Sequence, residues 1–288
     1  MIEAAEAHPA FRPIRGRFLC GITPQYPWES GLGIRDLGVT GKPKNPIVLI
    51  PARLASIRLP GKPLADIGGE PMIVHVWRRA TEAGVGPVAV AAAEAEIAAA
   101  VERAGGRAIL TDPSHPSGSD RIAEALQRID PGRRHDAVIN VQGDLPTLEP
   151  AAIRAALEPL AEPDVDIGTL ATEIADTAEL QSIHVNKIAV AFAPGRRIGR
   201  ALYFSRLVIP SGAGPHYHHI GIYAYRRDAL EGFVRLPPTP LERRESLEQL
   251  RALEAGMRID VALVDTLPLG VDTPADLARA REILAPHR

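Results

Sequence analysis

The chain has 288 residues, an ordinary soluble composition, a net charge of −2 at pH 7 and a single cysteine, Cys20. A nearly neutral chain has no strong field to attract nucleic acid, and no apolar run approaches the roughly 18 residues of a membrane helix. One cysteine excludes an internal disulfide and is typical of a reducing compartment. We therefore expect a cytoplasmic protein that binds no nucleic acid and does not insert into membranes.

Residues 1–45 differ from the rest of the chain. They contain scattered Pro and Gly, the isolated aromatic residues Tyr26 and Trp28, and no hydrophobic period. We expect a poorly ordered N-terminal extension here, with a docking segment as the alternative. Residues 46–288 are then expected to form one domain.

From residue 46 onward, short apolar runs alternate with amphipathic stretches. The sequence predicts strands at 47–50, 87–92, 108–110 and 137–141, and helices at 71–83, 94–104, 119–129 and 151–160. Such alternation of strands and helices predicts an α/β fold with a mostly parallel central sheet and right-handed crossovers.

The pattern changes after residue 165. Strand-like runs at 166–172, 187–192, 201–204 and 220–225 follow one another without predicted helices. We interpret residues 175–225 as an antiparallel excursion that serves substrate binding and dimerisation. The chain then predicts a helix at 241–255, a strand at 257–264 and a last helix at 272–283, opened by Asp272-Thr273-Pro274.

A basic loop follows the first predicted strand. It carries the cations Arg53, Arg58 and Lys62 and the hydroxyl of Ser56. Open α/β sheets hold ligands at the carboxyl ends of their strands, and three close cations repel unless an anion lies among them. Arg offers forked donors and Lys a compact charge, so a triphosphate fits. The spacing matches neither a Walker loop nor a dinucleotide-binding turn, and a solvated basic loop is the alternative.

Two acidic residues are expected at the same edge of the sheet as the basic loop. Asp144 follows the strand at 137–141 in the run Gln142-Gly143-Asp144, and Asp272 precedes the last helix. Mg²⁺ typically takes one or two carboxylates together with phosphate oxygens and water. Taken alone, Asp144 fits a tight turn and Asp272 a helix cap. Opposite the basic loop, the pair predicts a magnesium site.

Further polar segments could complete a site. The loop 115–121 leads into a helix, whose N-terminus suits polar ligand atoms, with Ser119-Asp120 as its expected cap. His219 and Tyr223 lie four apart in a strand and so share a face, whereas His218 faces the other way, which argues against a shared zinc. No Ser–His–Asp or Cys–His nucleophile system is visible.

Seven blocks occur in a specific order: IVLIPARLASIRLPGKPL, HPSGSDRIAEA, INVQGDLP, ALYFSR, HIGIYAYRR, SLEQLRALEAG and GVDTPADL. Over about residues 46–285 the chain thereby resembles the 3-deoxy-manno-octulosonate (Kdo) cytidylyltransferases, also called CMP-Kdo synthetases. The resemblance implies a fold of the sugar nucleotidyltransferase type and, usually, a homodimer. It implies that CTP and Kdo react with Mg²⁺ in the cytoplasm to give CMP-Kdo and pyrophosphate, for lipopolysaccharide biosynthesis.

The resemblance also implies roles by position. The nucleotide would be held by Arg53, Ser56, Arg58, Lys62, Ser117, Gly118, Asp120 and Arg121. Mg²⁺ would be held by Asp144 and Asp272, and these two acids with Arg53 and Lys62 would be the catalytic group. The sugar acid would be contacted by Gln142, Arg206, His219, Tyr223, Glu248 and Gln249.

The chain departs from the family pattern in four places. The positions are Ala92-Ala93 for a Thr-Asp pair, Leu145 for an acid, Ile183-His184 for Pro-Asn, and Ile57 for Thr or Ser. A cytidylyltransferase for a related acid sugar is the alternative, although YFSR and HIGIY argue against the sialic acid branch. The lost Thr-Asp pair also leaves open a catalytically weak nucleotide-binding paralogue, against which the retained Asp144 and Asp272 argue.

Overall fold

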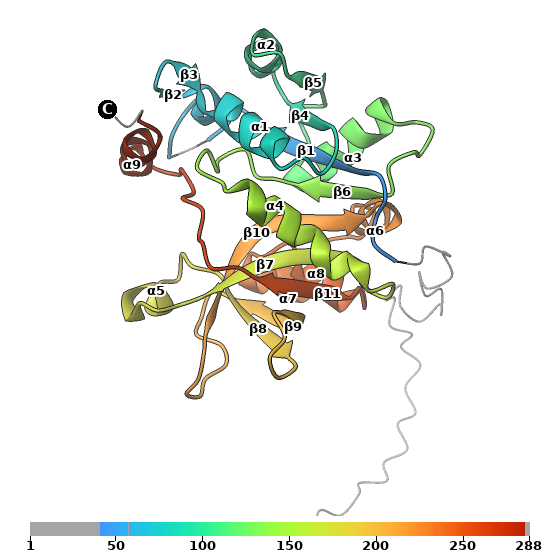
Figure 1. Cartoon of the computed structure of the whole chain (residues 1–288), viewed down its shortest axis with the longest axis vertical. Helices are drawn as coiled ribbons and strands as arrows, with labels where there is room; N and C mark the ends of the chain where they lie inside the picture. The colour runs from blue at the N-terminus through green and yellow to red at the C-terminus, as the bar shows by residue number, and fades with distance from the viewer. Residues whose placement is uncertain (1–40, 57, 286–288) are drawn as a thin grey trace, which may run out of the picture. The chain divides into compact units, whose positions relative to one another are not determined.

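The computed structural model describes residues 41–56 and 58–285. Most of the expected extension, residues 1–40, and the departure at Ile57 lie outside the described residues. Within the described part, nine strands form one sheet in the order β5-β4-β1-β6-β10-β7-β11-β9-β8 (Figure 1). None of the helices described is both long and apolar enough to cross a membrane.

The first half of the sheet is entirely parallel. It consists of β5 (Arg107–Leu110), β4 (Val88–Ala92), β1 (Pro46–Ala52) and β6 (Ala137–Asn140). Ile47, Val48, Leu49 and Ile50 of β1 are fully buried. A run of consecutive apolar residues is what a parallel strand covered on both faces requires.

The second half contains β10 (Tyr217–Arg226), β7 (Ile167–Glu173), β11 (Ile259–Leu263), β9 (Ile198–Ser205) and β8 (Lys187–Phe192). β10 is antiparallel to both β6 and β7, β11 is parallel to β7, and β9 is antiparallel to β11 and β8. All the strands except β9 and β10 therefore run in one direction, which confirms the predicted sheet. A short pairing of β8 with β10 also closes this half into a ring.

Helices cover both faces of the sheet (Figure 1). One face carries α1 (Met72–Glu82), α2 (Ala95–Arg103) and α4 (Pro150–Leu157), and the other carries α3 (Gly118–Ile129) and α6 (Arg227–Phe233). Side chains of β1 alternate between the two cores: Val48 packs in the first, Leu49 in the second. Both faces of β1 are thus removed from water.

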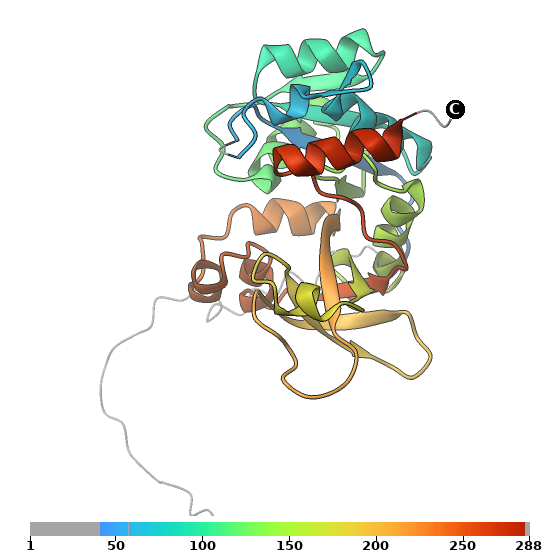
Figure 2. The same cartoon turned by 90° about the vertical axis from the view of Figure 1, so that its left-hand side faces the viewer.

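The last helix, α9 (Pro274–Leu284), packs on a third, smaller core. Its Leu277 joins Ile67 of β2 (Asp66–Ile67), which forms a small hairpin with β3 (Glu70–Pro71). Arg281 donates a hydrogen bond to the Asp66 carbonyl at 2.9 Å, and Figure 2 shows α9 beside this blue segment. A capping box of Thr273 and Asp276 fixes the start of α9, as the sequence predicts.

The predicted helix over 241–255 is wrong. The segment forms two short helices, α7 (Pro240–Glu245) and α8 (Leu250–Glu254), because Ser246 adopts a left-handed conformation with φ 55°. That conformation ends α7 and turns the chain, so that Leu247 packs in the core. An ion pair of Arg251 with Glu242 joins the two helices.

Three smaller expectations also need correction. Ser117, not Ser119-Asp120, caps α3, because its hydroxyl accepts from the Asp120 amide at 3.2 Å. The segment after β7 contains a short helix, α5 (Thr177–Gln181), held by the Asp176 cap, so the excursion is not free of helices. The helix α6 was not predicted at all, because seven residues are too few to show a helical period.

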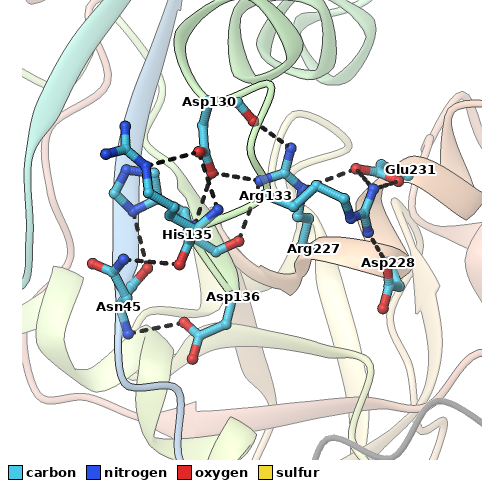
Figure 3. A network of polar contacts seen from close by, with 9 residues as sticks. Asn45, Asp130, Arg133, His135, Asp136, Arg227, Asp228 and Glu231 are labelled. Carbon is cyan, nitrogen blue, oxygen red and sulfur yellow. Dashed lines mark hydrogen bonds and ion pairs between the residues drawn. The ribbon is translucent and has the colours of Figure 1, made fainter.

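A buried polar network holds the end of the sheet where β1 and β6 begin (Figure 3). The Asp130 side chain is fully buried and accepts from the His135 amide and from Arg227. Despite its burial, these amide and guanidinium donors hold the pKa of the Asp130 carboxyl well below its usual range. Nearby, the Asn45 amide donates to Asp136, which ties the entry of β1 to the entry of β6.

We predict that Asp130→Asn lowers the free energy of unfolding by about 3 kcal/mol at pH 7, because Arg227 loses its buried counter-charge. The lowered folded-state pKa makes this contribution complete above the unfolded Asp value of about 4, and it is lost as the pH falls below that value. The difference from wild type should therefore shrink between pH 5 and pH 3 in urea unfolding.

Asp228→Asn is the control, because Asp228 pairs with the half-exposed Arg133 in the same network. An exposed pair contributes only about 0–1 kcal/mol. Equal losses of unfolding free energy in the two variants would show that the burial of Asp130 does not increase its contribution to stability.

Candidate active site

The basic loop leaves β1 at Ala52 and closes on itself. The Gly61 amide donates to the Leu54 carbonyl at 3.3 Å, and the Leu54 amide donates to the Glu94 carboxylate at 2.9 Å. Gly61 has φ +68°, a left-handed conformation that residues with a Cβ resist. This turn starts the 3-10 helix η3 (Lys62–Leu64) and brings Lys62 back toward the sheet.

Lys62 lies between the two acids that were predicted to act together. Its Nζ is 2.8 Å from Oδ2 of Asp144 and 3.0 Å from Oδ1 of Asp272. Arg58 Nη2 is 2.9 Å from the other oxygen of Asp272. Four residues from three distant segments of the chain thus meet where β1 and β6 end.

Backbone contacts explain why the two acids meet. The Val271 amide donates to the Asp144 carbonyl at 3.0 Å, which places the residue before Asp272 against Asp144. Gly143 allows β6 to approach β1, since a Cβ there would lie 2.8 Å from the Pro51 carbonyl oxygen. The main chain therefore brings the two acids together, and the contacts with Lys62 orient their side chains.

The charge of Lys62 is set by opposing effects. Burial alone would lower the pKa of its ammonium, but Asp144 and then Asp272 outweigh burial and raise it. Lys62 therefore stays protonated at physiological pH. Within residues 41–56 and 58–285, no three His, Cys, Asp or Glu side chains gather to hold a metal, so a metal here needs ligand oxygens beside the two acids.

These charges border a cavity of about 440 Å³. Its polar and charged lining, with two glycines, consists of Arg53, Ser56, Arg58, Lys62, Ser117, Gly118, Arg121, Gln142, Gly143, Asp144 and Asp272. The structure therefore brings together the residues expected to bind nucleotide, except that Asp120 serves in the cap of α3, where it accepts from the Ser117 hydroxyl at 2.7 Å. Gln142, expected to contact the sugar, borders the same cavity.

Arg121 is buried at the edge of this cavity. Its guanidinium donates to the Thr111 hydroxyl at 2.7 Å and to the Asp112 carbonyl at 3.0 Å, which are neutral oxygens. Burial lowers the pKa of Arg121, although the group remains charged. A buried cation held by neutral partners favours an anion nearby.

A second polar group comes from β10. His219 is buried, and its ring packs against Phe204 at 4.9 Å and Tyr223 at 5.5 Å between centroids. Its Nε2 lies 3.0 Å from the hydroxyl of Thr169. Burial, and to a lesser extent His218, lowers the pKa of His219 to about 3, so the ring is neutral at physiological pH. Burial also raises the pKa of Tyr223.

The turn between α7 and α8 supplies Glu248 and Gln249. The Ser119 hydroxyl donates to Glu248 at 3.0 Å, which links this turn to the start of α3 beside the cavity. Burial raises the pKa of the Glu248 carboxyl. The helix break at Ser246 is what turns these two side chains inward, so a continuous helix would have misplaced them.

Several buried polar atoms in this region lack a hydrogen-bond partner among the described residues. They are Asn186 Oδ1, His219 Nδ1, Glu248 Oε1 and Gln249 Nε2. Buried polar atoms are normally paired, so these atoms suit a polar ligand. Asn186 was missed by sequence reasoning; it lies opposite His219, whose amide donates to its carbonyl at 2.8 Å, and only strand pairing reveals this.

Arg206 lies farther along the excursion. Its Nε donates to the Glu245 carbonyl at 3.2 Å and its Nη1 to the Ile183 carbonyl at 3.3 Å. The Arg206 carbonyl in turn accepts from Lys187 at 2.9 Å. Lys187 is fully buried, and burial together with Arg206 lowers its pKa. These contacts fix the backbone on which Arg206 stands.

The departures from the family pattern have local explanations. Leu145 is buried in the first core, so an apolar contact replaces the acid expected there. Ala92 is fully buried at the end of β4, and the Ala93 amide donates to the Ala52 carbonyl at 2.9 Å. His184 is exposed. None of these three disturbs the contacts of Lys62 with its two acids.

Comparisons with known proteins agree with this geometry. A family model described as cytidylyltransferase matches residues 47–259. The 3-deoxy-manno-octulosonate cytidylyltransferase of Paramagnetospirillum magneticum is 65% identical over 240 residues, which cover 83% of this chain and 98% of the relative. That of Rhodospirillum centenum is 64% identical over 249 residues, covering 86% and 97%.

A solved structure of CMP:2-keto-3-deoxy-manno-octonic acid synthetase complexed with CTP matches with a TM-score of 0.77 and 40% identity, over 84% of this chain and 99% of that chain. The family model spans well over half of the chain, and the curated relatives are covered almost completely. The chain therefore belongs to the cytidylyltransferase family and, within it, to the 3-deoxy-manno-octulosonate cytidylyltransferases.

Proposed function

We propose that this enzyme transfers the cytidylyl group of CTP to Kdo and releases pyrophosphate, giving CMP-Kdo. One observation carries the proposal: Asp144 and Asp272 converge on Lys62 at the edge of a cavity lined by Arg53 and Arg58. The arrangement offers cations for a triphosphate and acids for a divalent ion in one place. The names of the relatives supply the nucleotide and the sugar.

The cations of the loop would bind the triphosphate. Arg58 now contacts Asp272 and would exchange this carboxylate for phosphate oxygens, to which a guanidinium donates in a fork. Lys62 would supply a compact charge at the same phosphates. The buried Arg121 would add positive potential beneath them without moving.

Asp144 and Asp272 fit Mg²⁺. Their oxygens lie within 3.0 Å of the single Lys62 Nζ, so the two carboxylates already converge on one cation. Mg²⁺ needs only one or two carboxylates when phosphate oxygens and water complete its coordination shell. When bound, it would neutralise charge at the α-phosphate and lower the pKa of the attacking hydroxyl.

The reaction would be an in-line attack of the C2 hydroxyl of Kdo on the α-phosphorus. Such transfers depend mainly on positioning and on neutralising charge, so no side-chain base is required. Arg53, Arg58 and Lys62 would stabilise the departing pyrophosphate. The unpaired atoms of His219, Glu248 and Gln249 would hold sugar hydroxyls, since each can make one more hydrogen bond.

The assembly would be a homodimer formed through the antiparallel excursion. Ile183, Leu202 and Leu207 expose between 58% and 68% of their surface there, more than the other large apolar side chains among the described residues. The catalytic unit would be residues 46–288, acting in the cytoplasm to supply CMP-Kdo for lipopolysaccharide.

We predict that purified protein releases pyrophosphate with CTP, Mg²⁺ and Kdo, and much more slowly with sialic acid. UTP should react more slowly than CTP, but the loss of polar side chains at Ala92 and Ala93 should make this preference modest, because each missing hydrogen bond forfeits roughly 0.5–1.5 kcal/mol. An absence of pyrophosphate release with Kdo would refute the proposed function, and equal rates with UTP and CTP would refute the base preference.

We predict that Asp144→Asn and Asp272→Asn each lower turnover by roughly 10³-fold and leave the fold intact, because each removes charge from the metal site. The double variant should be little worse than either single variant, since residues that act as one unit are not additive. Turnover is measured at saturating Mg²⁺, CTP and Kdo.

Asp265→Asn is the matched control, because Asp265 is an exposed acid that pairs with Arg197 at 2.8 Å. It should retain full activity. Multiplicative losses in the double variant would argue against one shared metal, even if each acid matters.

We predict that Leu202→Glu together with Leu207→Glu converts a dimer into a monomer in light scattering, because two charges would face each other across an apolar contact. Leu110→Glu is the control, because Leu110 is another exposed leucine at the other edge of the sheet, and this variant should remain dimeric. A monomeric wild type would overturn the proposed assembly.

A further inference from the structure

Strand β10 is irregular where it carries His219. Its pairing with β7 shifts between Ile220 and Tyr223, so Gly221 and Ile222 have no partner in β7. Bulges of this kind re-aim side chains and are common beside active sites. The position in β7 that faces this irregularity is Thr169, which is fully buried.

The Thr169 hydroxyl has three neighbours. Its Oγ1 lies 2.9 Å from the Ile222 carbonyl, 3.3 Å from the Ile220 carbonyl and 3.0 Å from Nε2 of His219. Both carbonyl oxygens can only accept a hydrogen bond, and the hydroxyl has one proton to give. If that proton goes to a carbonyl, Thr169 can satisfy His219 only by accepting from it.

This hydrogen-bond assignment places the proton of the neutral imidazole on Nε2. With Nε2 donating to Thr169, a neutral ring has a bare lone pair at Nδ1. Nδ1 is buried and has no partner among the described residues. Packing against Phe204 and Tyr223 holds the plane of the ring, so the lone pair has a fixed direction.

We propose that Thr169 is a positioning residue that locks His219 in the Nε2-protonated form, so that Nδ1 accepts a hydrogen bond from a hydroxyl of the sugar acid. The substrate class rests on the proposed function; the locked form of the imidazole does not. A fixed neutral acceptor selects a hydroxyl donor and offers nothing to a carboxylate. The carboxylate of the sugar acid would therefore be bound elsewhere in the site.

The first test needs no substrate. In ligand-free protein carrying ¹⁵N-labelled histidine, the His219 signals, assigned with His219→Gln, should show a protonated Nε2 and a bare Nδ1. Thr169→Ser keeps the hydroxyl and should keep this form, whereas Thr169→Val removes it and should give a mixture of both forms. A protonated Nδ1 in the wild-type protein would overturn the proposal.

The second test is kinetic. Thr169→Val should raise KM for Kdo about tenfold, with KM for CTP unchanged, whereas Thr169→Ser should remain within about twofold of wild type. A folded Thr169→Val protein with an unchanged KM for Kdo would overturn the positioning role.

Two outcomes remain distinct. If Thr169→Val fails to fold because a carbonyl of β10 loses its donor, the wild-type spectrum still tests the protonated form of His219, and the Thr169→Ser kinetics still test the positioning role of Thr169. If the wild-type protein does not use Kdo, the proposed function fails, while the spectrum still decides whether Thr169 locks the ring.

Discussion

The contact of Lys62 with both Asp144 and Asp272 is the interaction on which the site depends. Two carboxylates brought together without a cation repel each other, and the ammonium between them removes that cost. The same contact keeps both acids aimed at one point before any substrate arrives. A divalent ion and a triphosphate would then take over the two sides of an existing arrangement, which limits the reorganisation that binding requires.

The two ends of the sheet meet different demands. At the start of β1 and β6, Asp130 is buried with Arg227. The Asp130 oxygens also accept hydrogen bonds from backbone amides, so the negative charge of Asp130 is compensated. At the opposite end, Arg58 and Asp272 remain about half exposed and can exchange partners. A buried network at one end stabilises the strands that present exposed charges at the other.

In the region proposed to bind the sugar, several buried polar atoms have no hydrogen-bond partner among the described residues. Leaving His219 Nδ1, Gln249 Nε2 or Asn186 Oδ1 unpaired costs free energy in the ligand-free protein. The ring formed by β7, β11, β9, β8 and β10 holds the strand that carries His219, and the Thr169 hydroxyl donates to the Ile222 carbonyl in its bulge. We infer that this rigid frame tolerates the unpaired atoms because a hydroxyl-rich ligand can complete them.

The sequence by itself determined the features that depend on neighbours along the chain. The apolar run of β1, the alternation of strands and helices, the basic loop and the capped start of α9 all follow from local pattern, and the order of motifs indicated the family. Placing Arg58, Lys62, Asp144 and Asp272 in one site was also within reach, because strand ends in a parallel sheet share an edge.

Only the tertiary structure decided the rest. The helical pattern of 241–255 is continuous in sequence, yet packing of Leu247 and the left-handed Ser246 break it and aim Glu248 and Gln249. Asn186 faces His219, and Thr169 faces the bulge of β10, only because strands distant in sequence pair in a particular register. Register and hydrogen-bond completion are properties of the folded sheet, and no local pattern in the chain encodes them.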